Sequence, residues 1–387
     1  NPLGSEGASH IVDVVFLGGP MVSLVMSDCQ IGLEGVVKIA EAVEASTSLC
    51  SLCLSNERKQ VLGGMKFSNE IDGMGASLLA HALEQSYTLT RLDLSGCQIG
   101  VKGLQALGEV LKPVNYTRSA PDSSVDYKGI VSSWEQRALF AATGTRGALR
   151  CLALSTCLLG PEGAEALKHV LLRNPALVGL DLSQSGIMGT GVAHICIALG
   201  ANPKYHVDSN TTLTSLNLQC CQAYAAGATH VADMVRHNNH LRRLNLSDND
   251  VGAVGARLIA DALKVNMSLE HLDLAKNNLG EDGAVYVAEA LAVNVRLCGL
   301  DISYNGVGDA GATALARAID KNKSLTLLDV TANLHVSALG AWYLSVAAKS
   351  KPTGWDRRLR YRGLPSHLQV RADLPRMLSV ADHKRVL

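Results

Sequence analysis

Leucines alternate with polar residues in short segments that recur along the chain. In residues 244–252, Leu244 and Leu246 flank the polar Asn245, which is the alternation of a short strand with one buried side. A Gly-Ala pair follows at 255–256, and apolar residues then recur every three or four positions, which predicts a helix with one buried side. The pattern therefore predicts short strands alternating with helices.

The strand–helix unit repeats every 28 residues. Asn249, taken as the anchor of its unit, is followed at this spacing by Asn277, Asn305 and Asn333. A Gly lies six residues after nearly every anchor, and such a fixed period is the signature of a repeat architecture. The chain holds about eleven repeats when all anchors are counted. The other anchors, Asn or a small substitute, are Asn1, Cys29, Asn69, Cys97, Cys157, Ser185 and Cys221.

Each part of the unit has a physical reason. Asn at the anchor can donate and accept hydrogen bonds to the backbone of its loop, and Cys is a small substitute with a weak S–H donor. A single strand and helix cannot bury their apolar sides alone, so neighbouring units must stack into a solenoid. Helices are wider than strands, so the stack is expected to curve with parallel strands on its concave side. We call the outward side of this strand layer the strand face.

The series L-x-L-x-x-(N/C)-x-(L/I/V)-G, with the Gly-Ala helix after it, resembles the ribonuclease-inhibitor-like subfamily of leucine-rich repeats. The resemblance extends from the start of the chain to about Ser350. It implies an α/β leucine-rich-repeat solenoid, a horseshoe of about eleven 28-residue strand–helix repeats with parallel strands on the concave face. Families with such repeats include inhibitors, innate-immune sensor regions, Ran GTPase-activating proteins, tropomodulin-like proteins and ciliary scaffold subunits.

Two regions are predicted: a solenoid over residues 1–350 and a basic C-terminal tail over residues 351–387. Longer intervals between anchors indicate insertions near 58–68, 113–144 and 204–211. Asn1 already holds an anchor position, so the sequence begins in the middle of a repeat and its first strand is expected upstream. The 28-residue period breaks after residue 350, so the tail is not expected to continue the solenoid.

Charge is distributed unevenly between body and tail. Residues 349–387 contain ten Lys/Arg and three Asp/Glu, a net charge of +7, which leaves −7 on residues 1–348 of this neutral chain. An acidic body argues against a nucleic-acid-binding function. Because the tail also contains apolar residues, we expect it to dock on an acidic surface, either of this body or of a partner. The tail residues expected to make this contact are Trp355, Arg357, Arg358 and Arg360.

Enzyme and cofactor motifs are absent from the sequence. It contains no H-E-x-x-H, no P-loop and no nucleophile elbow. Cys50 and Cys53 form a C-x-x-C within a strand, where alternation sends the two side chains to opposite sides, so no zinc site is expected. No apolar run reaches the roughly 18 residues of a membrane span. The prediction is a non-enzyme with no cofactor, metal or small-molecule substrate.

The strand face should carry the residue between the two leucines of each strand. Asp273, Asp301 and Asp329 hold this position in three successive repeats and predict an acidic strip that binds a basic partner segment. The alternative is a purely structural role, because Asp or Asn is common here in the resembling subfamily. Three residues flank the strip, Arg243, His271 and Tyr304, and the largest insertion adds Trp134 and Phe140 as binding candidates or as parts of a neutral loop.

The leading hypothesis is a non-enzymatic protein-interaction scaffold, a subunit of a larger intracellular assembly. The ten cysteines show no secreted-type framework, which indicates a reducing, cytoplasmic or cytoskeleton-associated setting. The resembling families suggest a cytoskeletal or ciliary complex. One alternative is a regulator of a small GTPase that resembles the Ran GTPase-activating proteins, with Arg58 in an insertion as its arginine. Another is the ligand-sensing repeat region of an innate-immune receptor.

Overall fold

The computed structural model describes residues 3–16, 21–56, 68–111, 149–200, 209–349 and 359–360. The predicted insertions lie largely outside these ranges. The chain divides into two compact units, which are described separately. The first unit comprises Asn1–Ile187 with Val207–Leu216, and the second comprises Met188–His206 with Asn217–Leu387.

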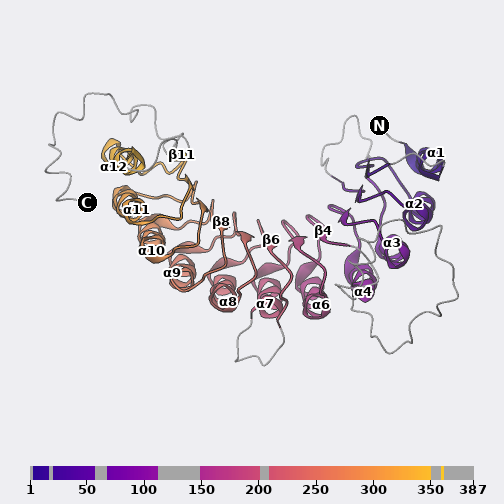
Figure 1. Ribbon diagram of the computed structural model, residues 1–387, viewed down its shortest axis with the longest axis horizontal. Coiled ribbons are helices and arrows are strands. Elements are labelled where there is room, and N and C mark those ends of the chain that lie inside the picture. Colours follow the sequence, from indigo (N-terminus) through magenta and orange to yellow (C-terminus); the bar gives the residue numbers. More distant parts are fainter. Residues whose placement is uncertain are drawn as a thin grey trace. The chain divides into compact units, whose positions relative to one another are not determined.

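The first unit alternates helices with three-residue strands (Figure 1). Strands β1 to β5 pair in parallel and in chain order, with equivalent leucines in register, such as Leu24 with Leu52 and Leu52 with Leu92. The elements are α1 (Gly4–Phe16), β1 (Ser23–Val25), α2 (Leu33–Ala45), β2 (Ser51–Cys53), α3 (Gly73–Gln85), β3 (Arg91–Asp93), α4 (Gly100–Val110), β4 (Cys151–Ala153), α6 (Gly160–Arg173) and β5 (Gly179–Asp181).

The second unit repeats the same alternation. Strands β7 to β11 pair in parallel and in chain order, with Leu244, Leu272, Leu300 and Leu328 in register. The strand β6 (Ser215–Asn217) has residues in both units. The other elements are α7 (Met188–Leu199), α8 (Tyr224–His237), β7 (Arg243–Asn245), α9 (Gly252–Leu263), β8 (His271–Asp273), α10 (Gly280–Val293), β9 (Gly299–Asp301), α11 (Asp309–Lys321), β10 (Leu327–Asp329), α12 (Ala338–Lys349) and β11 (Leu359–Arg360). The predicted fold of parallel strands, each with a helix, is confirmed.

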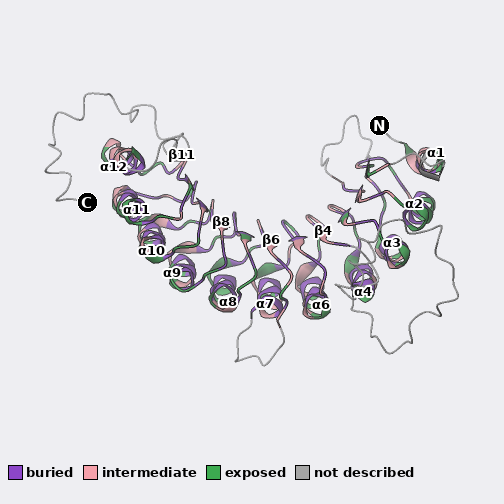
Figure 2. Ribbon diagram, viewed as in Figure 1, coloured by how far each residue is buried: buried purple, intermediate pink, exposed green. Residues whose placement is uncertain are grey.

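The apolar core of each unit lies between its strand layer and its helix layer (Figure 2). Leu244 and Leu246 are buried as the strand alternation predicts. The Gly of the Gly-Ala pair lets the helices approach closely. A Cβ on Gly255 would lie 2.8 Å from the Cβ of Ala228 on the neighbouring helix, nearer than two carbon atoms can pack.

The anchor asparagines form a buried ladder that joins successive repeats. Asn249, Asn277, Asn305 and Asn333 are at most 2% exposed, which confirms their predicted burial. The Asn277 side-chain amide donates to the Leu246 carbonyl (2.8 Å), one repeat earlier. Equivalent bonds connect Asn305 with Leu274 (2.8 Å) and Asn333 with Ile302 (3.1 Å). Loop backbone that would otherwise be buried without partners is satisfied in this way.

Cysteines hold the anchor position in part of the first unit. The Cys97 thiol donates to the Leu54 carbonyl (3.5 Å), and the Cys157 thiol donates to the Leu94 carbonyl (3.1 Å). Burial raises the pKa of Cys157 to about 12 and also raises the pKa of Cys97. Both thiols therefore stay protonated near neutral pH and keep the S–H donor that the loop requires.

The strand layer continues past residue 350. Strand β11 pairs in parallel with β10, with Leu359 opposite Leu328 and Arg360 opposite Asp329. The expectation that the tail cannot continue the solenoid is wrong for these two residues. Strand pairing needs only backbone groups, and it tolerates the change of spacing from 28 to 31 residues.

Within the ranges that the structure describes, no helix is both long enough and apolar enough to cross a membrane.

Candidate functional site

The strand face of the second unit carries a row of acidic and amide side chains. Strand register aligns Asn245 with Asp273, Asp273 with Asp301, and Asp301 with Asp329. Neighbouring strands lie about 4.8 Å apart, so the three aspartates occupy consecutive positions of one row. We call Asp273, Asp301 and Asp329 the acidic strip. The structure thus brings the three predicted acidic residues together.

Each carboxylate of the acidic strip also stabilises the turn that follows its strand. The Oδ1 atom accepts a hydrogen bond from the backbone N–H two residues later, at 2.8–3.0 Å. The Asn245 side chain does the same for Ser247 (2.8 Å). A structural role therefore explains why Asp or Asn stands here. It does not explain the negative charge, because the neutral amide of Asn245 caps the same turn.

Electrostatic repulsion acts along the acidic strip. Burial raises the pKa of Asp273, the hydrogen bond from the Ala275 N–H lowers it, and the negative charges of Asp301 and Asp329 raise it further. The fold therefore holds like charges close together in a partly desolvated row. A cation bound across the strip would relieve this repulsion.

His271 occupies space that a glycine leaves open. A Cβ on Gly299 would lie 2.4 Å from the His271 Nδ1 atom, so any larger residue at this position of β9 would displace the imidazole. In the first unit, Gly179 makes equivalent room for the Cys151 side chain, whose Sγ would lie 3.3 Å from such a Cβ. The sequence signal for this packing was a glycine at the first position of a strand, which the prediction overlooked.

Tyr304 lies beside a lysine that was not predicted as part of the site. The Lys276 Nζ atom is 5.6 Å from the centre of the Tyr304 ring, a cation–π geometry. Tyr304 is exposed, and both residues have positive φ angles in the turns after their strands. The exposed ring can therefore contact a cationic side chain near the acidic strip. Arg243, at the start of β7, is exposed on the same strand face.

Several predicted binding residues lie outside the described part of the chain. These are Trp134, Phe140, Trp355, Arg357 and Arg358, together with Arg58 of the GTPase-regulator hypothesis. Arg360 is described only through its backbone, which pairs with Asp329 at the end of the acidic strip. Their roles in binding stay predictions.

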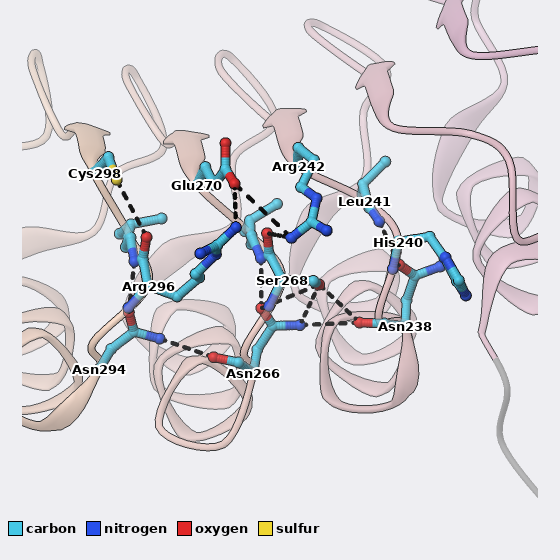
Figure 3. Close-up of polar contacts among 12 residues, drawn as sticks. Asn238, His240, Leu241, Arg242, Asn266, Ser268, Glu270, Asn294, Arg296 and Cys298 are labelled. Atoms are coloured by element: carbon cyan, nitrogen blue, oxygen red, sulfur yellow. Dashed lines mark hydrogen bonds and ion pairs between the residues drawn. The ribbon is translucent and has the colours of Figure 1, made fainter. Parts of the chain in front are cut away.

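A second asparagine ladder, absent from the prediction, lies at the turns between helices and strands (Figure 3). Asn238, Asn266 and Asn294 stand 17 residues after anchors, a spacing that could have revealed them. The Asn266 Nδ2 donates to the Asn238 carbonyl (3.1 Å), and the Asn294 Nδ2 donates to the Asn266 carbonyl (3.1 Å). Each Oδ1 accepts backbone N–H groups of its own turn, as Asn266 does from Ser268 and Leu269.

Beside this ladder, one carboxylate serves two guanidinium groups (Figure 3). Glu270 Oε1 accepts a hydrogen bond from Arg296 Nη2 at 2.5 Å and lies 3.8 Å from Arg242 Nη1. The Arg242 guanidinium also donates to the Ser268 carbonyl (3.0 Å). All three side chains are partly exposed, so each pair contributes roughly 0–1 kcal/mol.

Cys50 and Cys53 make separate contacts. The Cys53 Sγ lies 3.3 Å from the hydroxyls of Ser27 and Ser55 on the strand face, while the Cys50 thiol donates to the Ser48 carbonyl (3.3 Å). In the described part of the chain, no group of three His, Cys, Asp or Glu residues could hold a metal ion.

The buried anchor ladder, the parallel strands and the backing helices define a leucine-rich-repeat protein of the ribonuclease-inhibitor-like type. The family model described as "Leucine Rich repeat" matches residues 20–40, 85–108, 209–222, 237–260, 265–288 and 300–316. Leucine-rich-repeat and ribonuclease-inhibitor-like families are typically non-enzymatic scaffolds for protein interaction.

Curated relatives match about half of the chain. The NACHT, LRR and PYD domains-containing protein 13 of Homo sapiens is 28% identical over 194 residues, which cover 50% of this chain and 18% of that protein. The ribonuclease inhibitor of Mus musculus is 26% identical over 201 residues, 51% of this chain and 41% of the inhibitor. The chain thus matches less than half the length of either relative.

Solved structures of other proteins also match this chain. The leucine-rich-repeat-containing protein LegL7 from Legionella pneumophila is 16% identical and has a TM-score of 0.46. The match covers 80% of this chain and 83% of that one.

Proposed function

We propose that this chain is a non-enzymatic scaffold that binds a basic segment of a partner protein through the strand face of its second unit. The observation that carries the proposal is the row formed by Asp273, Asp301 and Asp329. Each side chain caps a turn, yet Asn245 caps its own turn without a charge. The turns require only a capping oxygen, so the three negative charges need another explanation. Binding of a cationic partner segment would provide one.

The residues around the acidic strip suit a basic segment. Arginine side chains of a partner can make charge-assisted hydrogen bonds to carboxylates. The exposed ring of Tyr304, which already contacts Lys276, offers a further surface for a cation. His271 and Arg243 flank the strip at the starts of β8 and β7, and they would set the position and orientation of the segment.

The basic tail of this chain is a competing occupant of the acidic strip. The pairing of Arg360 with Asp329 in strand register supports its proximity. On this proposal, Trp355, Arg357 and Arg358 hold the tail near the strip until a partner segment replaces it. The variant W355A/R357A/R358A should then bind a basic peptide more tightly than the wild type does.

The proposed setting is a larger intracellular assembly, cytoskeletal or ciliary. A second candidate, the ligand-sensing repeat region of an innate-immune-type receptor, is favoured by one observation. This chain is 28% identical to segments of two NACHT, LRR and PYD domains-containing relatives, and these segments make up 18% and 22% of the relatives' lengths. Expression in cells with affinity capture would separate the two candidates, since recovered partners should be either assembly subunits or receptor components.

The binding test uses fluorescein-labelled peptides of equal length that are arginine-rich, neutral or acidic. The triple variant D273N/D301N/D329N keeps the turn-capping oxygens and removes the charges. We expect the arginine-rich peptide to bind the wild type and to bind the triple variant at least tenfold more weakly. Asp261→Asn, which removes one negative charge from α9, is the control and should leave affinity unchanged. Equal binding by wild type and triple variant would refute the proposal.

A further inference from the structure

The turns between helices and strands in the second unit lie side by side. The Asn266 amide donates to the Asn238 carbonyl, the Asn294 amide to the Asn266 carbonyl, and the Asn322 amide to the Asn294 carbonyl, at 2.8–3.1 Å (Figure 3 shows the first two). These contacts form one continuous surface from the four turns 236–240, 264–268, 292–296 and 320–324. We call this surface the turn ridge.

Four apolar side chains gather on the middle of the turn ridge. The ladder asparagines point inward and are buried, so the residues on either side of each asparagine point outward. In the two middle turns these residues are 56–65% exposed. They are Val265 and Met267 around Asn266, and Val293 and Val295 around Asn294.

Folding does not require apolar residues at these positions. The equivalent residues of the first turn are His237 and Asn239, and those of the last turn are the exposed Lys321 and Lys323. Polar side chains are therefore compatible with the same turn and the same ladder. Isolated exposed apolar residues are ordinary, but four neighbours in adjacent repeats form a patch of the kind that marks an interaction site.

Cationic groups border this apolar patch. Arg296 follows Val295 directly. Among the described residues, Arg296 and Arg242 share one carboxylate, Glu270, within ion-pair distance. Lys321 and Lys323 lie on the adjoining turn and are exposed. The acids of the ridge are interspersed among these groups: Asp233 near His237, Asp261 and Glu289 around Lys264, and Asp320 beside Lys321.

We propose that the turn ridge is a second docking surface, which binds an acidic segment of a partner protein that also carries large apolar side chains. The apolar side chains would cover Val265, Met267, Val293 and Val295, and the partner's carboxylates would meet Arg296, Lys321 and Lys323. Met267 is unbranched and can adapt to the shape of its partner. The second unit would then bind two segments of opposite charge, one on the strand face and one on the turn ridge.

Charge favours such a segment over the other possible occupants. The tail of this chain is basic and would be repelled by the bordering cations. An anionic membrane would attract those cations, but it would also meet Asp261, Glu270 and Glu289 at the same surface. A folded or extended protein segment can place its carboxylates at the border and keep them away from these acids.

The test starts from random twelve-residue peptides displayed on phage and selected on the full chain. Peptides retained by the wild type but not by the variant M267E/V295E should be net negative and contain at least two large apolar residues. A synthetic copy should bind the variant at least tenfold more weakly by fluorescence anisotropy. K321E/K323E and added salt should also weaken it. Val254→Glu, an exposed apolar position of α9, is the matched control and should bind as wild type does.

Unchanged thermal unfolding of M267E/V295E would show that the loss is local. The triple variant of the acidic strip should bind the acidic peptide normally, which separates this proposal from the proposed function. The proposal is wrong if selection yields no peptide that distinguishes wild type from M267E/V295E, or only basic peptides. It is also wrong if the patch instead drives self-association in sedimentation, or binds phosphatidylserine vesicles, and M267E/V295E abolishes either behaviour.

Discussion

The side-chain amide of Asn277 donates to the carbonyl of Leu246, 31 residues earlier, at 2.8 Å. The Oδ1 atom of the same asparagine accepts the backbone N–H groups of Asn249 and Val251, each at 3.2 Å. One buried side chain thus satisfies both donors and acceptors in the preceding repeat. The ladder of such asparagines ties repeats together through hydrogen bonds as well as through apolar packing.

Asn277→Ala should therefore destabilise the protein strongly. The substitution leaves two buried N–H groups and a buried carbonyl without their partner, and we expect the free energy of unfolding to fall by about 3 kcal/mol. Urea unfolding followed by circular dichroism measures the change. Asn239→Ala, an exposed asparagine of a turn, is the control and should change stability by less than about 0.5 kcal/mol. Similar losses in both variants would contradict the role of the ladder.

Asp273→Asn should stabilise the protein at neutral pH. The amide keeps the cap on the Ala275 N–H and removes repulsion from Asp301 and Asp329, a gain of roughly 0.5 kcal/mol. The folded state raises the pKa of Asp273 above its ordinary value of 3.8, so wild-type stability falls as pH rises from that value. The advantage of the variant should be absent near pH 3 and present at pH 7.

The reverse charge change provides the control for this prediction. Asn245→Asp keeps the capping oxygen and adds a fourth carboxylate next to Asp273 in the strand register. It should lower stability at pH 7 and have little effect near pH 3. An Asp273→Asn variant that loses stability at neutral pH would show that the charge of Asp273 contributes to the fold after all.

Gly299→Ala should act through His271. The new Cβ would lie 2.4 Å from the imidazole, which must move, and we expect a loss of about 1 kcal/mol. In the background of His271→Ala the same substitution should cost much less, because the obstructing ring is gone. A double-mutant cycle on unfolding free energies measures this coupling. Additive effects would mean that the cost arises from the backbone of β9.

The Cys157 thiol should resist alkylation in the folded protein. Its pKa of about 12 leaves almost no thiolate at pH 8, and it is buried and bonded to the Leu94 carbonyl. Iodoacetamide labelling followed by mass spectrometry should modify the partly exposed Cys298 well before Cys157. In urea the two rates should converge. Early labelling of Cys157 in the native protein would show that its repeat opens readily.

The sequence by itself determined the repeat, its anchors and the strand face. A 28-residue period places each anchor over the next, so burial of Asn277 and alignment of Asp273 with Asp301 follow from counting. Local alternation was enough to decide which leucines point inward. These features depend on contacts that recur in every repeat. The same contact requires the same type of residue at the same position of each repeat, so the sequence shows it.

Only the tertiary structure decided which individual side chains contact one another. It showed that Asp273 caps a turn, that Gly299 makes room for His271, and that Glu270 joins Arg242 with Arg296. It also added β11 where the period had ended, because backbone pairing does not depend on side-chain spacing. The contacts of Glu270 and His271 join residues 26 or 28 positions apart in neighbouring repeats and are not shared by every repeat. No periodicity predicts them, because they follow from the distances that stacking sets between side chains.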